Sequence, residues 1–224
     1  MVKEQAIIRT PITRGRTLDH VAYVYDILSP PMTFFQESRI GKKAASLLNL
    51  KGTEKILDIG CGTGTLTIQI AKMLQPDQGG LIVGLDAAPK MLQKARKKAA
   101  QIPQIRFDLA AAEKLPYPGE YFDCAISTFF FHHVDLELKK KTLDELWRVI
   151  RRQGRVIIVD VDIPTTLFGK LCAYLGYVLF RQPEIKENID GKLRLVITES
   201  RFKSFKIVAA HLGYVSIFEL IKGD

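Results

Sequence analysis

The chain has 224 residues and 47% of them are hydrophobic, which allows a single domain with a substantial buried core. Its three widely spaced cysteines include no Cys-x-x-Cys pair, so we expect no disulfide framework, no metal site and a reducing, cytoplasmic environment. The formal net charge of +9 at pH 7 would suit nucleic acid or an anionic membrane, although much of it comes from short basic clusters typical of solvated helix faces.

The first sixteen residues form a basic arm that lacks the apolar core of a secretory signal. Two helices are predicted after it, at residues 18–28 and 34–48, separated by the Ser-Pro-Pro break at 29–31. Strand and helix patterns then alternate along the chain. We predict strands at 54–59, 81–86, 104–108, 121–127 and 154–161, and helices at 64–75, 88–100 and 136–151. This alternation implies right-handed βαβ units and a parallel sheet with helices on both faces.

The last third of the chain is less regular. Residues 164–180 are apolar and predicted to be helical, but Pro164, Lys170 and two glycines interrupt them too often for a membrane span. A further helix is predicted at 184–200, where Gly191 and a β-branched run weaken the pattern.

The C-terminal residues favour an antiparallel hairpin, with strands at 202–210 and 214–222. The alternative is a helix at 198–212 that leaves one terminal strand. We expect residues 1–48 to form an arm and a helical cap, and residues 49–224 to form one structural unit.

A glycine-rich segment follows the first predicted strand: residues 56–64 read Ile-Leu-Asp-Ile-Gly-Cys-Gly-Thr-Gly. Glycines allow a sharp turn and let a ligand lie against bare backbone. The spacing differs from the G-x-G-x-x-G of dinucleotide sites, and Asp58 would repel a pyrophosphate but accept a ligand ammonium. An ordinary strand–turn–helix is the alternative. The segment resembles the first motif of the class I S-adenosylmethionine-dependent methyltransferases, whose acid and glycine loop hold the methionine part of the cofactor. That resemblance implies a cofactor role for Asp58, Gly60, Cys61, Gly62, Thr63 and Gly64.

A second acid, Asp86, ends the next predicted strand. There it would face the ligand crevice at the carboxyl edge of the sheet, where its two acceptor oxygens suit a ribose diol. The same position in the family binds the cofactor ribose, and residues matching Ala87 and Met91 pack on adenine. A helix cap is the alternative role for this acid.

Residues 110–117 resemble the family's G-D-A-x-x-L-P-F stretch, with Ala111 in place of the usual aspartate. The resemblance implies that adenine is then bound by the backbone amides of Ala112 or Glu113, or by the Glu113 side chain. Asp108 is a possible displaced substitute. We expect a somewhat weaker affinity for the cofactor.

Residues 121–134 resemble the family signature F-D-x-x-x-S-S-x-x-L-H-H-V. Ser127 and Thr128 fall at the end of the fourth strand, which in the family lies near the sulfonium of the cofactor. We favour His132 as the catalytic base of the histidine pair because it lies closer to that strand end. The alternative is that both histidines cap a helix or pack under a lid.

Two further segments carry the resemblance. Residues 21–26 are similar to the V-A-x-x-Y-D opening of the quinone-biosynthesis and phospholipid-type branch (methyltransferase type 11), which implies that Tyr25 closes over the methionine end of the cofactor; core packing is the alternative. Residues 146–160 match a helix, a turn and a fifth strand, with Arg-Gln-Gly in place of Pro-Gly-Gly. Asp160 and Asp162 lie at the exit of that strand, and we expect one of them to orient a polar group of the substrate.

The resemblance implies a Rossmann-like, seven-stranded, mostly parallel α/β fold and an enzyme that converts S-adenosyl-L-methionine to S-adenosyl-L-homocysteine. Its acceptor would be a small hydrophobic or amphipathic molecule, such as a quinone precursor or lipid, methylated by in-line displacement. The apolar residues 167–180 would cover that substrate and, with the basic surface, indicate transient contact with an anionic membrane; a homodimer contact or a core helix is the alternative.

Two other functions remain open at this point. A nucleic-acid methyltransferase is favoured only by the net charge, since the chain lacks an Asn-Pro-Pro-Tyr motif and a catalytic cysteine pair. A non-catalytic S-adenosylmethionine-binding protein is weakly suggested by Ala111 and by the lost turn proline.

Overall fold

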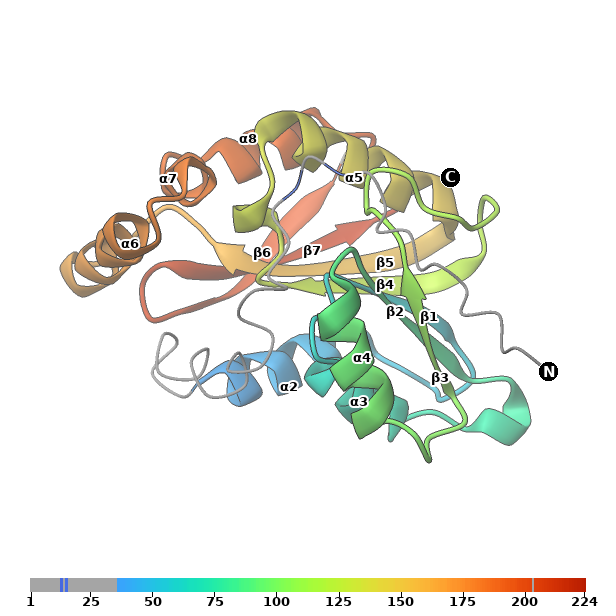
Figure 1. Cartoon of the computed structure of the whole chain (residues 1–224). Helices are drawn as coiled ribbons and strands as arrows, with labels where there is room; N and C mark the ends of the chain where they lie inside the picture. The colour runs from blue at the N-terminus through green and yellow to red at the C-terminus, as the bar shows by residue number, and fades with distance from the viewer. Residues whose placement is uncertain (1–12, 14, 16–35, 203) are drawn as a thin grey trace.

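A seven-stranded sheet forms the centre of the protein in the computed structural model, which describes residues 13, 15, 36–202 and 204–224 (Figure 1). The strand order is β3-β2-β1-β4-β5-β7-β6. The strands are β1 (Lys55–Ile59), β2 (Leu81–Asp86), β3 (Ile105–Leu109), β4 (Phe122–Thr128), β5 (Ile150–Val161), β6 (Phe205–His211) and β7 (Val215–Ile221). The first five are parallel, whereas β7 pairs antiparallel with both β5 and β6. The predicted fold class and terminal hairpin are therefore confirmed, and the alternative helix at 198–212 is wrong.

Helices cover both faces of this sheet (Figure 1). They are α2 (Glu37–Leu47), α3 (Thr65–Ala71), α4 (Pro89–Lys98), α5 (Leu136–Val149), α6 (Leu167–Phe180), α7 (Pro183–Ile189) and α8 (Lys192–Glu199), with short 3-10 turns η2 (Pro76–Gln78) and η3 (Phe131–His133). Successive side chains of a strand point to opposite faces, so Leu57 packs in the core cluster under α5 and α8 while Ile56 packs in the cluster that includes α2 and α3. Burial on both faces explains why the parallel strands are almost continuously apolar.

The junction between α5 and β5 differs from the prediction of a helix to residue 151 and a strand from 154. The helix ends at Val149 and the strand begins at Ile150, so the Arg-Gln-Gly segment lies within β5 and is no separate turn. A register shift between Phe122 and Cys124 of β4 absorbs the extra residues. Gln153, at a positive φ of 58°, donates its backbone N–H to the carbonyl of Lys222 and so joins this irregular stretch to the C-terminus.

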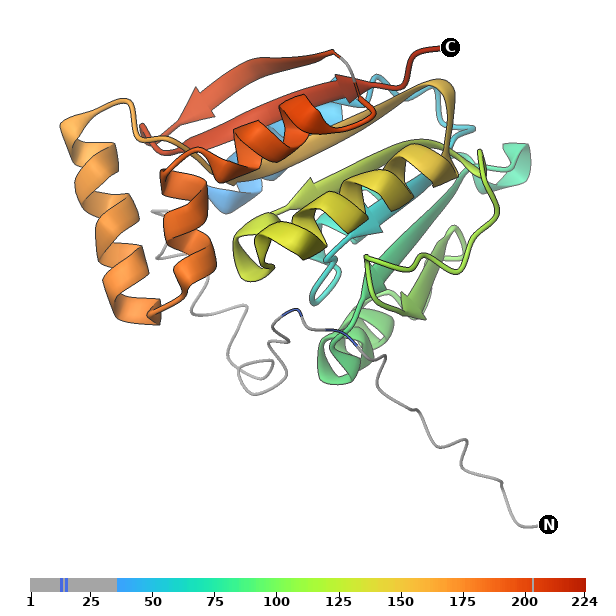
Figure 2. The ribbon, with the colours of Figure 1, turned by 90° about the horizontal axis from the view of Figure 1, so that it is seen from above.

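The predicted helix at 184–200 is in fact two helices, α7 and α8, that meet at Gly191. Gly191 has a φ of +86°, a conformation that interrupts an α-helix and that glycine adopts without steric cost. The helices α6 and α7 lie beyond the carboxyl end of β5, whereas α8 runs beside α5 over one face of the sheet (Figure 2). Within the described residues, no helix is sufficiently long and apolar to cross a membrane.

The structure describes only part of the N-terminal region for which helices are predicted. The helix predicted at 34–48 is α2, which begins at Glu37 and buries Ile40 and Ala44 in the core beside α3. The helix predicted at 18–28, Tyr25 and most of the basic arm lie outside the described residues.

Candidate functional site

An open cleft lies at the carboxyl ends of β1, β2 and β4. Eight residues predicted for the site line it: Gly60, Gly62, Asp86, Ala87, Met91, Ala112, Glu113 and Thr128. Eight others were not predicted: Thr13, Gly15, Leu85, Ala110, Phe129, Phe130, His133 and Val134. The parallel topology explains this location, because the carboxyl ends of β1, β2 and β4 meet at one edge of the sheet.

The glycine loop forms one wall of the cleft. Gly60 has a φ of +70°, and a Cβ there would collide with Phe130. Gly62 has a φ of +53°, and a Cβ there would meet nothing within 4 Å, so its bare backbone faces open space. The loop is held on β2, because the N–H of Gly60 donates to the carbonyl of Leu85 at 2.9 Å and that of Gly62 to Oδ2 of Asp86 at 2.8 Å.

Asp86 joins two elements at the centre of the cleft. Its Oδ2 accepts the Gly62 N–H, and its Oδ1 accepts the N–H of Ala88, the residue that precedes α4, at 2.8 Å. Asp86 thus orders the turn before α4 but does not cap the helix, because Ala88 is the N-cap residue and the helix has no side-chain cap. Asp86 lines the cleft, and carboxylate oxygens are acceptors of the kind that suit a diol.

Asp58 lies beneath the loop and does not line the cleft. Its side chain is 1% exposed, and its Oδ2 accepts a hydrogen bond of 2.6 Å from the hydroxyl of Thr67. Burial raises the pKa of Asp58 to about 7, and the neighbouring charge of Asp86 raises it further while the bond from Thr67 opposes the rise. Because burial disfavours the ionised form of Asp58, a cation brought close to it would stabilise the carboxylate and lower its pKa.

The remaining loop residues predicted to hold the cofactor also support the wall from behind. Burial, with the charges of Asp86 and Asp58, raises the pKa of the Cys61 thiol well above its usual range, so this thiol is neutral. Thr63 is buried, and its hydroxyl accepts a hydrogen bond of 2.8 Å from Nζ of Lys98. Gly64 packs against the ring of Phe107, because a Cβ at this position would lie 2.8 Å from Cζ of that ring.

On the opposite wall, Ala111 is buried between two alanines that line the cleft. Asp108, the hypothetical substitute for the missing aspartate, does not line the cleft. Its Oδ2 is bound by Arg106 at 2.8 Å and by the hydroxyl of Tyr117 at 2.9 Å. Glu113 is therefore the acidic side chain that this wall contributes.

Ser127 and Thr128 divide their roles at the end of β4. The buried hydroxyl of Ser127 donates to the carbonyl of Ile59 at 3.1 Å and so ties β4 to β1. Thr128, the next residue, lines the cleft. Ser127 thus shapes the strand ends without lining the cleft.

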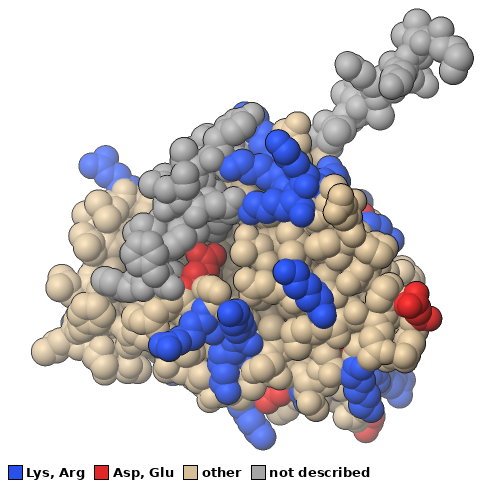
Figure 3. All heavy atoms as spheres, turned by 90° about the horizontal axis from the view of Figure 1, so that it is seen from below, with Lys and Arg blue, Asp and Glu red and all other residues tan. Residues whose placement is uncertain are grey.

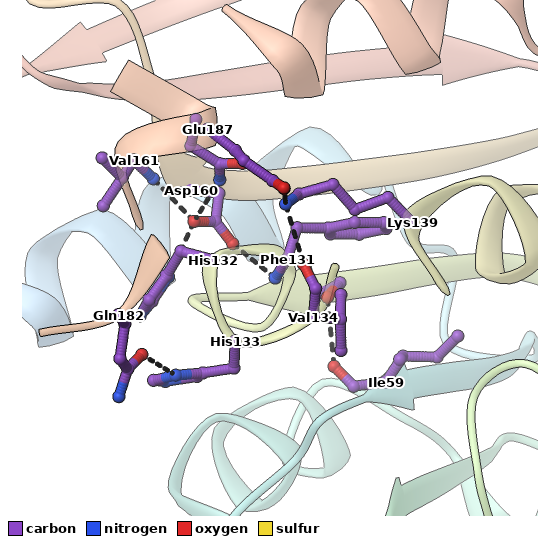
Figure 4. Close-up of polar contacts among 12 residues, drawn as sticks. Ile59, Phe131, His132, His133, Val134, Lys139, Asp160, Val161, Gln182 and Glu187 are labelled. Carbon is purple, nitrogen blue, oxygen red and sulfur yellow. Dashed lines mark hydrogen bonds and ion pairs between the residues drawn. The ribbon is translucent and has the colours of Figure 1, made fainter. Parts of the chain in front are cut away.

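The histidine pair lies on η3, directly after β4 (Figure 4). Nδ1 of His132 lies 2.7 Å from Oδ1 of Asp160, whose side chain is fully buried. His133 lines the cleft, and its Nδ1 lies 3.0 Å from Oε1 of Gln182. The two imidazole centroids are 4.0 Å apart. Asp162, by contrast, forms a double contact with Arg194 at 2.6–2.7 Å and is outside the cleft wall.

Comparisons with known proteins show the family of this chain. Residues 56–154 match the family model described as a methyltransferase domain. The chain is 35% identical to a demethylmenaquinone methyltransferase of Thermus thermophilus over 146 residues, 64% of each protein. It is 30% identical to the enzyme of that name from Staphylococcus saprophyticus over 215 residues, 85% of this chain and 91% of the relative.

The fold has close counterparts among solved structures. A crystal structure of a SAM-dependent methyltransferase from Aquifex aeolicus matches 92% of this chain and 99% of its own, with a TM-score of 0.63 at 18% identity. The chain spans 64% to 66% of the length of several demethylmenaquinone methyltransferases, including those of Thermus thermophilus and Tropheryma whipplei.

Proposed function

Because the chain belongs to the class I S-adenosylmethionine-dependent methyltransferases of the menaquinone and ubiquinone type, we propose that it methylates a quinol precursor in the cleft described above. The observation that carries the proposal is the cleft itself, in which a glycine loop and Asp86 face an aromatic wall that contains a histidine. When bound, S-adenosylmethionine would supply an activated methyl group on a positively charged sulfur.

The residues of the cleft suit that cofactor. The open space in front of Gly62 admits a ligand against bare backbone, and Asp86 presents carboxylate oxygens for ribose hydroxyls. Met91 and Ala87 offer an apolar surface for adenine, and Glu113 and the Ala112 amide are positioned to bind its polar edge. We propose Asp58 as the acid nearest the methionine ammonium, acting from beneath the loop.

The acceptor would occupy the end of the cleft beyond Thr128. Phe129, Phe130 and Val134 make this wall apolar, and His133 supplies a polar group within it. An aromatic ring that carries hydroxyl groups matches such a wall, because its faces pack on apolar side chains while its hydroxyl groups reach the histidines. The relatives named above act on demethylmenaquinone, which has that chemistry once it is reduced.

Transfer of a labelled methyl group tests the proposal. The purified protein would be given labelled S-adenosylmethionine with a reduced, short-chain demethylmenaquinol, with phosphatidylethanolamine, or with tRNA and DNA. We expect label on the quinol carbon and none on the lipid or nucleic acids. Transfer to nucleic acid, or retention of the cofactor without turnover on any acceptor, would favour one of the two alternative functions.

We further propose that α6 contacts an anionic membrane. Most of its apolar side chains are exposed, including Leu167 at 88% and Leu171 at 68%, while Ala173 on the other face is buried. Lys170 is the one charged residue of this helix. A continuous apolar surface of this kind is typical of a partner or membrane contact.

Charge supports a membrane as the partner of this surface. Burial lowers the pKa of His211, at the end of β6, and the nearby positive charges of Lys43 and Arg39 on α2 lower it further. These basic side chains therefore lie close to the end of β6. Figure 3, the view of the molecule from below, shows groups of Lys and Arg side chains beside broad uncharged areas of the surface. Anionic phospholipids pair with such basic side chains while an apolar helix face enters the acyl boundary. A lipid-soluble quinol would then reach the cleft from the same surface.

Vesicle binding tests this contact. The protein should co-sediment with phosphatidylglycerol vesicles in a salt-sensitive manner, and Leu171→Ser should weaken binding about tenfold, since burying one leucine contributes about 1.5–3 kcal/mol. Leu195→Ser is the matched control, because Leu195 is 44% exposed on α8. Equal binding by both variants, or a dimer in solution that Leu171→Ser dissociates, would overturn the proposal.

A further inference from the structure

We infer that Asp160 is a positioning residue that fixes His132 as the base for a hydroxyl proton of the acceptor. This inference rests on the proposed methyl transfer and adds to it the group through which His132 acts. Asp160 is the penultimate residue of β5, and His132 belongs to η3, so two segments 28 residues apart in sequence create the pair (Figure 4).

The carboxylate of Asp160 is held by hydrogen-bond donors on every side that the structure describes. Its Oδ2 accepts the backbone N–H of Phe131 at 2.7 Å. Its Oδ1 accepts the N–H of Val161 at 2.7 Å and the side-chain amide of Asn188 at 3.3 Å, in addition to its contact with His132. These bonds compensate the burial of a polar group and leave the carboxylate no freedom to turn away from the imidazole.

This arrangement selects one tautomer of His132. A carboxylate oxygen only accepts, so Nδ1 of the ring carries the hydrogen, and Nε2 of the neutral ring is then the nitrogen that accepts a proton. The side chain of His132 keeps 12% of its surface exposed, whereas that of Asp160 has none, so the imidazole is not sealed into the core. Its ring lies against that of His133, which lines the cleft.

The carboxylate of Asp160 suits His132 to the role of a base. A base becomes a cation when it accepts a proton, and a carboxylate 2.7 Å away stabilises that cation through a charge-assisted hydrogen bond. Nδ1 of His133 lies 3.0 Å from the amide oxygen of Gln182. The buried carboxylate of Asp160 thus makes His132 suited to become cationic when it accepts a proton.

The proposed step is a simple proton transfer. The O–H bond of an acceptor hydroxyl breaks, its proton moves to Nε2 of His132, and its electron pair stays on the oxygen. The resulting oxyanion makes the neighbouring ring carbon a better nucleophile. The proton afterwards leaves His132 for solvent, which restores the neutral ring.

A double-mutant cycle tests the inference. His132→Gln and Asp160→Asn should each lower kcat about 100-fold, the scale of general-base catalysis, with little change in the KM for the cofactor. Because Asp160 acts through His132, the double variant should be no slower than His132→Gln alone. Asp162→Asn is the matched control, because it also removes a fully buried carboxylate of the same segment. Any fall in kcat that it causes should multiply with the fall caused by His132→Gln, since Asp162 does not act through His132.

Nitrogen NMR of the imidazole rings adds a measurement that does not depend on turnover. At pH 8 we expect the proton of His132 on Nδ1 and none on Nε2. A proton on Nε2, or additive losses in the cycle, would overturn the inference even if the wild-type protein methylates the quinol. Failure of the wild-type protein to methylate any quinol, with the NMR result as expected, would instead count against the proposed function alone.

Discussion

The variant Asp58→Asn is expected to be more stable than the wild-type protein at pH 8 and to bind the cofactor product more weakly. Asp58 is buried and its pKa is raised to about 7, so above that pH the folded protein contains a buried charge. An asparagine stays neutral, and its amide oxygen can still accept the hydrogen bond from Thr67. The size of the pKa shift corresponds to a gain on the order of 4 kcal/mol.

The pH dependence of this gain follows from the direction of the shift. Between about pH 4, where the unfolded carboxyl ionises, and pH 7, the folded wild-type protein retains a proton that the unfolded chain has lost. The stability of the wild-type protein therefore falls through this range relative to the variant, and the penalty is complete above pH 7. The difference between the two proteins should shrink steadily as the pH is lowered from 7 toward 4.

Thermal unfolding from pH 4.5 to 8.5, with titration of S-adenosylhomocysteine at pH 8, measures both effects. We expect at least about a tenfold loss of affinity, because the ammonium of the ligand loses an ionised partner. A variant that is less stable at every pH, or one that binds the ligand like the wild-type protein, would show that Asp58 has only a structural role.

Features encoded in the backbone were predictable from the sequence. The apolar runs before Asp58 and Asp86 predict buried parallel strands, and their order along the chain places both acids at the same sheet edge. The terminal hairpin could be predicted because its two β-branched and aromatic strands are separated by a short turn that contains Gly213. The break at Gly191 was visible as a weakness, but the sequence alone did not show that it splits the helix.

Side-chain positions in irregular segments were not predictable in the same way. In a 3-10 turn consecutive side chains rotate by about 120°, so neighbouring residues face different directions. For this reason His133 lines the cleft while His132 faces Asp160. Gln182 is 49 residues from His133 in sequence, so no local sequence pattern predicts their contact.

Several residues predicted to contact the cofactor do not line the cleft, and their side chains form hydrogen bonds within its wall. The hydroxyl group of Ser127 donates to the carbonyl of Ile59, and that of Thr63 accepts from Lys98. A sequence motif does not distinguish such internal hydrogen bonds from contacts with a ligand. Asp108 points to the face of β3 that carries Arg106, since residues two apart on a strand share a face. Strand register, which the sequence leaves uncertain by a residue, decides such cases.

The second large effect is expected for Asp86→Asn. An asparagine has one acceptor oxygen where the carboxylate has two, so it cannot accept the N–H groups of both Gly62 and Ala88 and bind a diol as well. Hydrogen bonds to a charged group contribute about 1.5–3 kcal/mol each, so affinity for S-adenosylhomocysteine should fall about 100-fold. Asp108→Asn is the matched control, because Asp108 ends the adjacent strand but is bound to Arg106 and Tyr117.

Calorimetric titration of S-adenosylhomocysteine into the wild-type protein, Asp86→Asn and Asp108→Asn tests the cofactor site most directly. We expect one site per chain in the wild-type protein, an affinity within about threefold of it for Asp108→Asn, and the large loss confined to Asp86→Asn. Thermal unfolding of the same samples shows whether each variant is folded. Wild-type affinity in folded Asp86→Asn, or an equal loss in both variants, would contradict the assignment of this cleft to the cofactor.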